Sequence, residues 1–215
     1  MLPYGSESAR GIGPEYGRAM GLGGGPSEWD DYEWIRLSDL PETPPPAPRP
    51  GKQPLADAVL AWLQREGGWT AGAGSRVLLV DLDNLRADPV RWRDRMAMVV
   101  ALARQADAVA LAGQEGAVRR ARPHLEEFAG TAVAVAAGSD LADVALLAKV
   151  DELDLPDAQH LVVSNDGIFA ELAQCGPLVV LSPGRDALSD SLAAASVRVI
   201  DLAALEHDLP VPARA

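Results

Sequence analysis

The sequence predicts an α/β fold: a three-layer, doubly wound domain whose mainly parallel sheet has five or six strands. From Arg76 onward, short apolar runs alternate with amphipathic segments, which is typical of repeated strand and helix units. Residues are 48% apolar but only 5% aromatic, so the core must consist of Ala, Val and Leu. Such residues suit buried parallel strands, and right-handed crossovers then place helices on both faces of the sheet.

The apolar runs give the expected strands, and the amphipathic segments between them give the expected helices. We expect strands at about 76–81, 107–112, 131–136, 159–164, 177–182 and 197–201. We expect helices at about 88–104, 115–129, 140–153, 166–174 and 187–195. In a doubly wound sheet, ligands bind beyond the carboxyl ends of the strands, near the point where the strand order reverses. Chemistry is therefore expected at that edge.

The chain divides into four expected parts. Residues 1–53 are rich in Gly and Pro and lack the hydrophobic periodicity of a helix or strand, which predicts a disordered arm. Within this arm, the aromatic and acidic segment 28–40 is a candidate for docking on the domain or on a protein partner. Residues 54–75 are expected to form a docking helix and a linker, because apolar side chains share one helical stripe before Gly67 and Gly68. The α/β domain is expected at 76–207, and a flexible tail at 208–215.

Charge and cysteine content narrow the class of protein. The net charge of −12 argues against binding nucleic acid through a general basic field, although local contact is compatible with it. The single cysteine, Cys175, excludes an internal disulfide framework, which predicts a reducing cytoplasm. No basic start precedes an apolar run, so we expect neither secretion nor a membrane span. The Ala, Arg, Gly and Pro usage is compatible with a bacterial source, and the sequence does not indicate an oligomeric state.

Asp81 follows a buried run at the end of the first expected strand. An apolar strand cannot continue through a carboxylate, so Asp81 emerges where the strand leaves the core. Asp83 follows two residues later, and Asn84 is placed to brace Asp81. This segment is the first candidate for a functional site.

A second acidic segment lies between the third strand and its helix. Either Ser139 or Asp140 is expected to cap the helix, with Asp143 one turn further on. A plain capped helix start has the same pattern, so this segment alone favours a structural role.

A third segment follows the fourth strand, where Ser164 and Asp166 occupy a polar turn before a helix. Asp166 is also compatible with a simple cap. However, three elements bring a carboxylate to one edge of one sheet, and clustered carboxylates repel each other unless a cation joins them. A hard divalent ion, Mg²⁺ or Mn²⁺, explains the set most simply.

In this order, these motifs resemble the NYN branch of the PIN-like metal-dependent ribonucleases. The resemblance covers about residues 76–201 and depends on three motifs: Asp81-x-x-Asn84, Asp143-Val-Ala-Leu, and Ser164-x-Asp166-Gly167-x-Phe169. It implies a PIN-like fold in which Asp81, Asp143 and Asp166 are both catalytic and metal-coordinating. Asn84 would position the first acid, with Asp83, Asp140 and Ser164 as auxiliary residues. The implied activity is that of an endoribonuclease, which hydrolyses RNA phosphodiesters with a metal-activated water.

Two alternatives to the nuclease remain open. The first alternative is a catalytically degenerate module that binds RNA or protein, because the family usually has a further Asp where this chain has Ile168. The other follows from Asp81-Leu-Asp83, which also resembles the first motif of haloacid dehalogenase-type phosphatases. That reaction needs a Ser or Thr at the end of the second strand, where this chain has Gly113-Gln114.

Arginines near the expected edge are candidates for contact with a substrate backbone, foremost Arg86, Arg91 and Arg119, with Arg93, Arg95, Arg120 and Arg122 on the same two helices. Arg86 follows the first strand, Arg91 lies on the next helix and Arg119 on the one after. Arginines on an amphipathic helix more often form a solvated face, which is the competing interpretation.

Overall fold

The computed structural model describes residues 53–69, 71–72, 74–138, 140–155 and 157–209, and the backbone of Ile35–Arg36. The predicted arm at 1–53 and its docking segment at 28–40 lie outside the described residues, except for that short strand. Most of the predicted tail at 208–215 also lies outside them.

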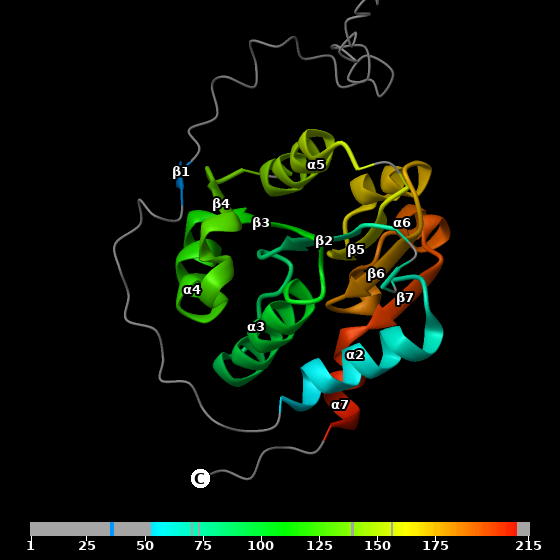
Figure 1. Cartoon of the computed structure of the whole chain (residues 1–215). Helices are drawn as coiled ribbons and strands as arrows, with labels where there is room; N and C mark the ends of the chain where they lie inside the picture. Colours follow the sequence, from blue (N-terminus) through cyan, green and yellow to red (C-terminus); the bar gives the residue numbers. More distant parts are fainter. Residues whose placement is uncertain are drawn as a thin grey trace, which may run out of the picture. The chain divides into compact units, whose positions relative to one another are not determined.

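The described residues form one seven-stranded sheet in the order β1-β4-β3-β2-β5-β6-β7 (Figure 1). Neighbouring strands from β4 to β7 are parallel, and β1 pairs with β4 antiparallel. The strands are β1 (Ile35–Arg36), β2 (Arg76–Asp81), β3 (Ala108–Gln114), β4 (Ala132–Val135), β5 (Gln159–Val163), β6 (Leu178–Ser182) and β7 (Arg198–Asp201). The expected doubly wound α/β fold with a mainly parallel sheet is confirmed.

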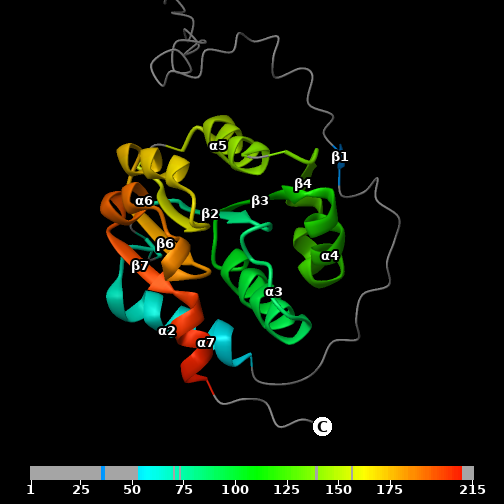
Figure 2. The ribbon, with the colours of Figure 1, turned by 180° about the vertical axis from the view of Figure 1, so that it is seen from behind.

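Helices cover both faces of the sheet, which gives the three layers (Figures 1 and 2). The first face packs against α2 (Pro54–Glu66), α3 (Pro89–Ala103), α4 (Glu115–Leu125) and α7 (Leu202–Asp208). The opposite face packs against α5 (Leu141–Leu153), the 3₁₀ helix η3 (Gly167–Gln174) and α6 (Asp190–Ala195). Two short 3₁₀ helices, η2 (Glu126–Thr131) and η4 (Arg185–Ala187), complete the described elements.

The central strand β2 supplies side chains to both cores by strand alternation. Leu78 and Val80 pack in the core between the sheet and the helices of the first face. Val77 and Leu79 pack in the core between the sheet and the helices of the opposite face. All four are almost fully buried, as a strand covered on both faces requires. The strand order reverses between β2 and β5, so the carboxyl ends of these two strands border the crevice expected to bind ligands.

Several boundaries differ from the sequence predictions for identifiable reasons. The expected helix at 115–129 ends at Leu125, because Glu126 adopts a left-handed φ of 51° and a 3₁₀ segment follows. The expected helix at 166–174 is 3₁₀ rather than α; its buried residues Phe169 and Leu172 are three apart, which matches the three-residue 3₁₀ turn. Helix α7 was not predicted, and it begins where the Asp201 side chain accepts a hydrogen bond from the N–H of Ala204.

None of the helices in the described part of the chain combines the length and apolar character needed to cross a membrane.

Candidate metal centre

Asp81 lies at the carboxyl end of β2, beside the end of β5. Its side chain is buried, with 3% of the residue exposed. The N–H of Asp83 donates to Oδ1 at 2.9 Å, and Nδ2 of Asn84 donates to Oδ2. Burial raises the pKa of Asp81, and these two hydrogen bonds oppose that rise. The predicted bracing by Asn84 is therefore present in the structure.

Ser164 and Asn84 join the ends of β2 and β5. Nδ2 of Asn84 also donates to Oγ of Ser164 at 3.2 Å, and the same Oγ accepts from the N–H of Asp166 at 3.2 Å. Oδ1 of Asp166 accepts from the N–H of Ile168 at 3.0 Å, so Asp166 caps η3. This cap occupies one carboxylate oxygen and fixes the orientation of the group.

Asp140 and Asp143 approach from the start of α5. Asp140 is the N-cap residue, but it has a left-handed φ of 65° and its side chain makes no capping hydrogen bond. An aspartate uncommonly adopts this backbone conformation, which here leaves its exposed carboxylate free of the helix end. Ser139, the other predicted cap, lies outside the described residues. Asp143 is buried, with 6% exposed, and its Oδ1 has no hydrogen-bond partner among the described residues.

The three carboxylates of Asp140, Asp143 and Asp166 converge. One oxygen from each lies within 4.8 Å of the other two. Burial, followed by the negative charges of Asp81 and Asp166, raises the pKa of Asp143 to about 7. A buried carboxylate with an unpartnered oxygen, beside other acids, fits a divalent cation, and an all-oxygen donor set is the one that Mg²⁺ and Mn²⁺ prefer.

The converging set differs in composition from the set predicted as ligands. The structure brings Asp143 and Asp166 together as expected, and the third converging oxygen comes from Asp140, which was expected only as an auxiliary residue. Asp81 lies close enough for its charge to act on Asp143, although it is outside the three-oxygen group. The site therefore comprises three converging acids with Asp81 beside them.

Comparisons with known proteins do not name this site. No family model matches the chain, and no curated protein matches it. The functional argument therefore depends on the geometry of the acids and their surroundings.

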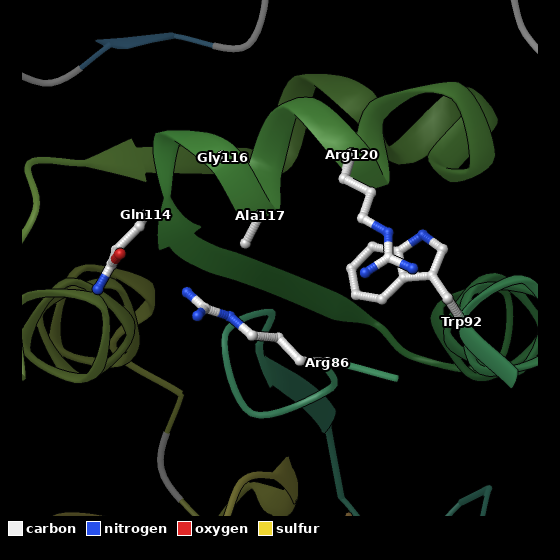
Figure 3. Close-up of a pocket in the computed structure, with 6 residues that line it drawn as sticks. All are labelled: Arg86, Trp92, Gln114, Gly116, Ala117 and Arg120. Atoms are coloured by element: carbon white, nitrogen blue, oxygen red, sulfur yellow. The ribbon is translucent and has the colours of Figure 1, made fainter. Parts of the chain in front are cut away.

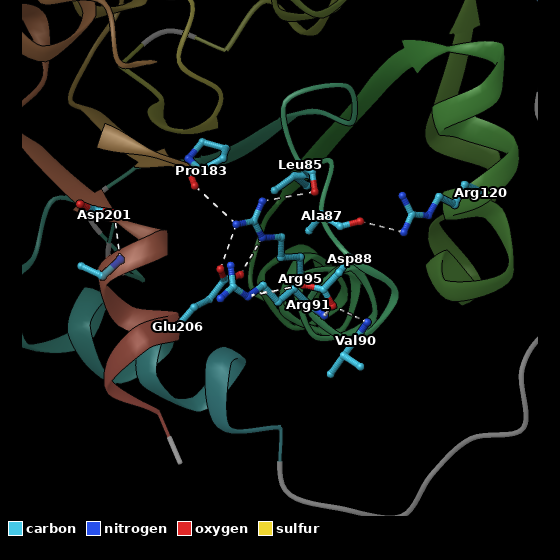
Figure 4. Close-up of polar contacts among 11 residues, drawn as sticks. Leu85, Ala87, Asp88, Val90, Arg91, Arg95, Arg120, Pro183, Asp201 and Glu206 are labelled. Atoms are coloured by element: carbon cyan, nitrogen blue, oxygen red, sulfur yellow. Dashed lines mark hydrogen bonds and ion pairs between the residues drawn. The ribbon is translucent and has the colours of Figure 1, made fainter. Parts of the chain in front are cut away.

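A buried ion pair holds the loops that follow β2 and β6 (Figure 4). Arg95 of α3 binds Glu206 of α7 through two contacts, Nε to Oε1 at 2.6 Å and Nη2 to Oε2 at 2.9 Å. The same guanidinium donates to the carbonyl oxygens of Leu85 at 3.3 Å and Pro183 at 3.4 Å. Arg95 thus connects the loops that follow β2 and β6 to the C-terminal helix.

Each of the three predicted substrate-binding arginines has a carboxylate partner in the structure. Arg86 forms an ion pair with Asp83 at 2.7 Å. Arg91 pairs with Asp88 at 3.6 Å, and Arg119 contacts Glu115 one turn away on its own helix. Arg91 and Arg119 are exposed, which agrees with the interpretation of a solvated helix face.

A pocket at the start of α4 contains two of the arginines that the sequence offers as candidates for substrate contact. Arg86 and Arg120 line it, together with Trp92, Gln114, Gly116 and Ala117 (Figure 3). Helical periodicity indicates that Arg120 shares a face with these small residues: it lies four residues after Gly116 and three after Ala117. Arg119 is the adjacent residue on this helix and points to a different face.

Proposed function

We propose that this domain is a divalent-metal-dependent ribonuclease of the NYN and PIN-like class. The observation that carries the proposal is Asp143: a buried carboxylate whose Oδ1 lacks a hydrogen-bond partner among the described residues, next to Asp140 and Asp166. A buried, unpaired charge is costly in a protein, and a cation shared with neighbouring acids removes that cost.

The first supporting point is the location of the acids. They lie at the carboxyl edge of a parallel sheet, next to the reversal of strand order between β2 and β5, where α/β domains of this topology bind their ligands. The three sequence motifs that resemble the nuclease family supply residues to this edge: Asn84 binds both Asp81 and Ser164, and Asp143 and Asp166 converge.

The side chains have distinct roles in the proposed site. Asp143 and Asp166 would hold Mg²⁺ or Mn²⁺ together with Asp140. Asn84 and the N–H of Asp83 keep Asp81 oriented at the edge of the site. Such a cation, when bound, lowers the pKa of a coordinated water and neutralises charge on the reacting phosphate. This chemistry requires no covalent nucleophile from the protein.

RNA cleavage tests the proposal directly. A labelled single-stranded RNA is incubated with the protein and Mn²⁺ or Mg²⁺, and the rate is compared with that of Asp143→Asn and Asp166→Asn. We expect both substitutions to reduce the rate on the order of 100-fold or more, because each removes a charged metal ligand. Asparagine is as good a cap as aspartate, so Asp166→Asn preserves the start of η3 while it changes the site.

Asp201→Asn provides a matched control. Asp201 also caps a helix at the carboxyl end of a strand, through the N–H of Ala204 at 3.1 Å, but it is not in the converging group. Its substitution is expected to leave the rate unchanged. Cleavage that is absent from the wild-type protein, or that survives both Asp143→Asn and Asp166→Asn, would refute the nuclease proposal.

A further inference from the structure

The pocket at the start of α4 has a composition unusual for this chain. The whole protein has 31 acidic and 19 basic residues, yet the pocket is lined by two arginines and by no carboxylate. Arg86 extends from the loop after β2 toward the start of α4, and Arg120 extends from α4 onto the ring of Trp92 (Figure 3). The two guanidinium groups therefore reach the same pocket from different elements.

Arg120 is held in place without an acidic partner. Its guanidinium lies 4.3 Å from the ring centroid of Trp92, and Nη2 donates to the carbonyl oxygen of Ala87 at 3.0 Å. No carboxylate among the described residues forms an ion pair with it. Its positive charge is thus positioned by an indole face and a carbonyl oxygen and is available to an anion.

The start of α4 adds further attraction for a negative group. Gln114 is the N-cap residue, but its side chain makes no capping hydrogen bond, so the first helical N–H groups have no side-chain acceptor from it. Gly116 and Ala117 of this first turn line the pocket, and a Cβ built on Gly116 would have no atom within 4 Å. The space beside the first turn of α4 at Gly116 is therefore open, close to the positive end of the helix dipole.

One side chain, Asp83, connects this pocket to the acidic site. Its Oδ1 accepts from Arg86 and its Oδ2 accepts from the N–H of Gln114 at 2.7 Å, while its own N–H donates to Asp81. Asp83 therefore contacts Asp81 on one side and two residues that line the pocket, Arg86 and Gln114, on the other.

We propose that this pocket binds a non-reacting phosphate of the RNA strand, next to the phosphate that is cleaved. The assignment rests on the proposed ribonuclease function. Arg86 and Arg120 contact the phosphate oxygens, and the start of α4 faces the same group. The pocket thereby supplies, at one place, the positive charge that a protein of net charge −12 lacks in general.

Binding of RNA without metal isolates the pocket from catalysis. Affinity for a fluorescent single-stranded RNA decamer is measured by anisotropy in EDTA at low salt. The parent protein and all variants in this assay carry Asp143→Asn, which lowers the repulsion between the acidic site and the RNA phosphates and prevents cleavage. We expect Arg86→Gln, Arg120→Gln and Gly116→Asp each to weaken binding about three- to tenfold, and each arginine substitution to make the salt dependence less steep.

Gly116→Asp separates binding from folding. A new carboxylate in the first turn of α4 is favourable for the helix and meets open space, so thermal stability should be kept while phosphate is repelled. Arg119→Gln is the control for Arg120, since Arg119 is the adjacent residue and pairs with Glu115. Gly130→Asp, at another open position, adds the same charge away from the pocket. Both controls should leave the affinity unchanged.

Three outcomes would overturn the pocket proposal: no RNA binding by the parent protein, equal losses in Arg119→Gln and Arg120→Gln, or equal affinity for adenosine 5′-monophosphate and the decamer. The last would indicate a site for free nucleotides. Failure of the ribonuclease proposal appears differently, as absent metal-dependent cleavage while the affinity for the decamer still depends on Arg86 and Arg120.

Discussion

Asp143→Asn is expected to make the metal-free protein more stable at alkaline pH, although it removes a proposed ligand. The carboxyl group is buried and lies among acids, so its pKa is raised from 3.8 to about 7. In the folded protein the neutral form is therefore favoured, and ionisation is opposed by burial and by the charges of Asp81 and Asp166. Asparagine keeps the shape of the side chain and never acquires the charge.

The magnitude follows from the difference between the two pKa values. Between pH 4 and pH 7 the native state binds more protons at Asp143 than the unfolded chain does, so the free energy of unfolding falls as the pH rises. A difference of about 3 pKa units corresponds to about 4 kcal/mol in total, of which roughly 2–3 kcal/mol is lost between pH 5 and pH 8. Asp143→Asn has no such ionisation, so between pH 5 and pH 8 its free energy of unfolding should rise by this amount relative to that of the wild type.

Urea unfolding monitored by circular dichroism, in EDTA at pH 5, 6, 7 and 8, measures the effect. The other acids titrate in both proteins and largely cancel in the difference between their free energies of unfolding. A difference that stays constant with pH, or a variant that is less stable at pH 8, would refute the buried and ionisable state assigned to Asp143.

Metal ions should reduce this difference in stability. A cation that binds only the folded state stabilises it by about 2.7 kcal/mol at a concentration 100 times its Kd. Mg²⁺ or Mn²⁺ should therefore stabilise the wild type at pH 8 and have much less effect on Asp143→Asn. An equal response of both proteins would contradict the assignment of Asp143 as a ligand.

Two further predictions concern the scaffold. Glu206→Gln should destabilise the fold by about 3–5 kcal/mol in urea unfolding, because it leaves Arg95 buried without its counter-charge; a loss below about 1 kcal/mol would contradict this. Gly176→Ala should cost more than about 1 kcal/mol, because the residue has a φ of 150° and an added Cβ would clash with the carbonyl oxygen of Ala158. Gly130→Ala, at an open position, should be tolerated, and equal effects of the two alanines would contradict the clash.

The sequence predicted the sheet well because buried parallel strands appear as continuous apolar runs. The end of β2 at Asp81 coincides with the prediction, since a carboxylate cannot continue such a strand in the core. The pairing of Asn84 with Asp81 was also predictable, because the two residues are three apart in one turn. Local spacing was sufficient for both features.

The composition of the acidic group was not predictable from spacing. Ser139 and Asp140 were equivalent candidates for the cap, and only the backbone shows that Asp140 has a left-handed φ and leaves its side chain uncapped. Arg95 and Glu206 are 111 residues apart, so their ion pair depends on the docking of α7, a helix too short to give a clear sequence signal. These features arise from tertiary structure rather than from local pattern.

The carboxyl edge of the sheet contains a destabilising carboxylate, that of Asp143, and a stabilising ion pair, that of Arg95 with Glu206. Asp143 has a buried, unpartnered oxygen among like charges, which weakens the fold near the edge of the sheet when no cation is bound. Arg95 holds the loops after β2 and β6 at the same edge, through the carbonyl oxygens of Leu85 and Pro183, and is itself fixed by Glu206 (Figure 4). These contacts hold the loop that follows Asp81, whereas Asp166 is oriented by its own cap on η3. In the proposed metal centre, a divalent cation would relieve the repulsion among these acids and supply the missing partner of Asp143.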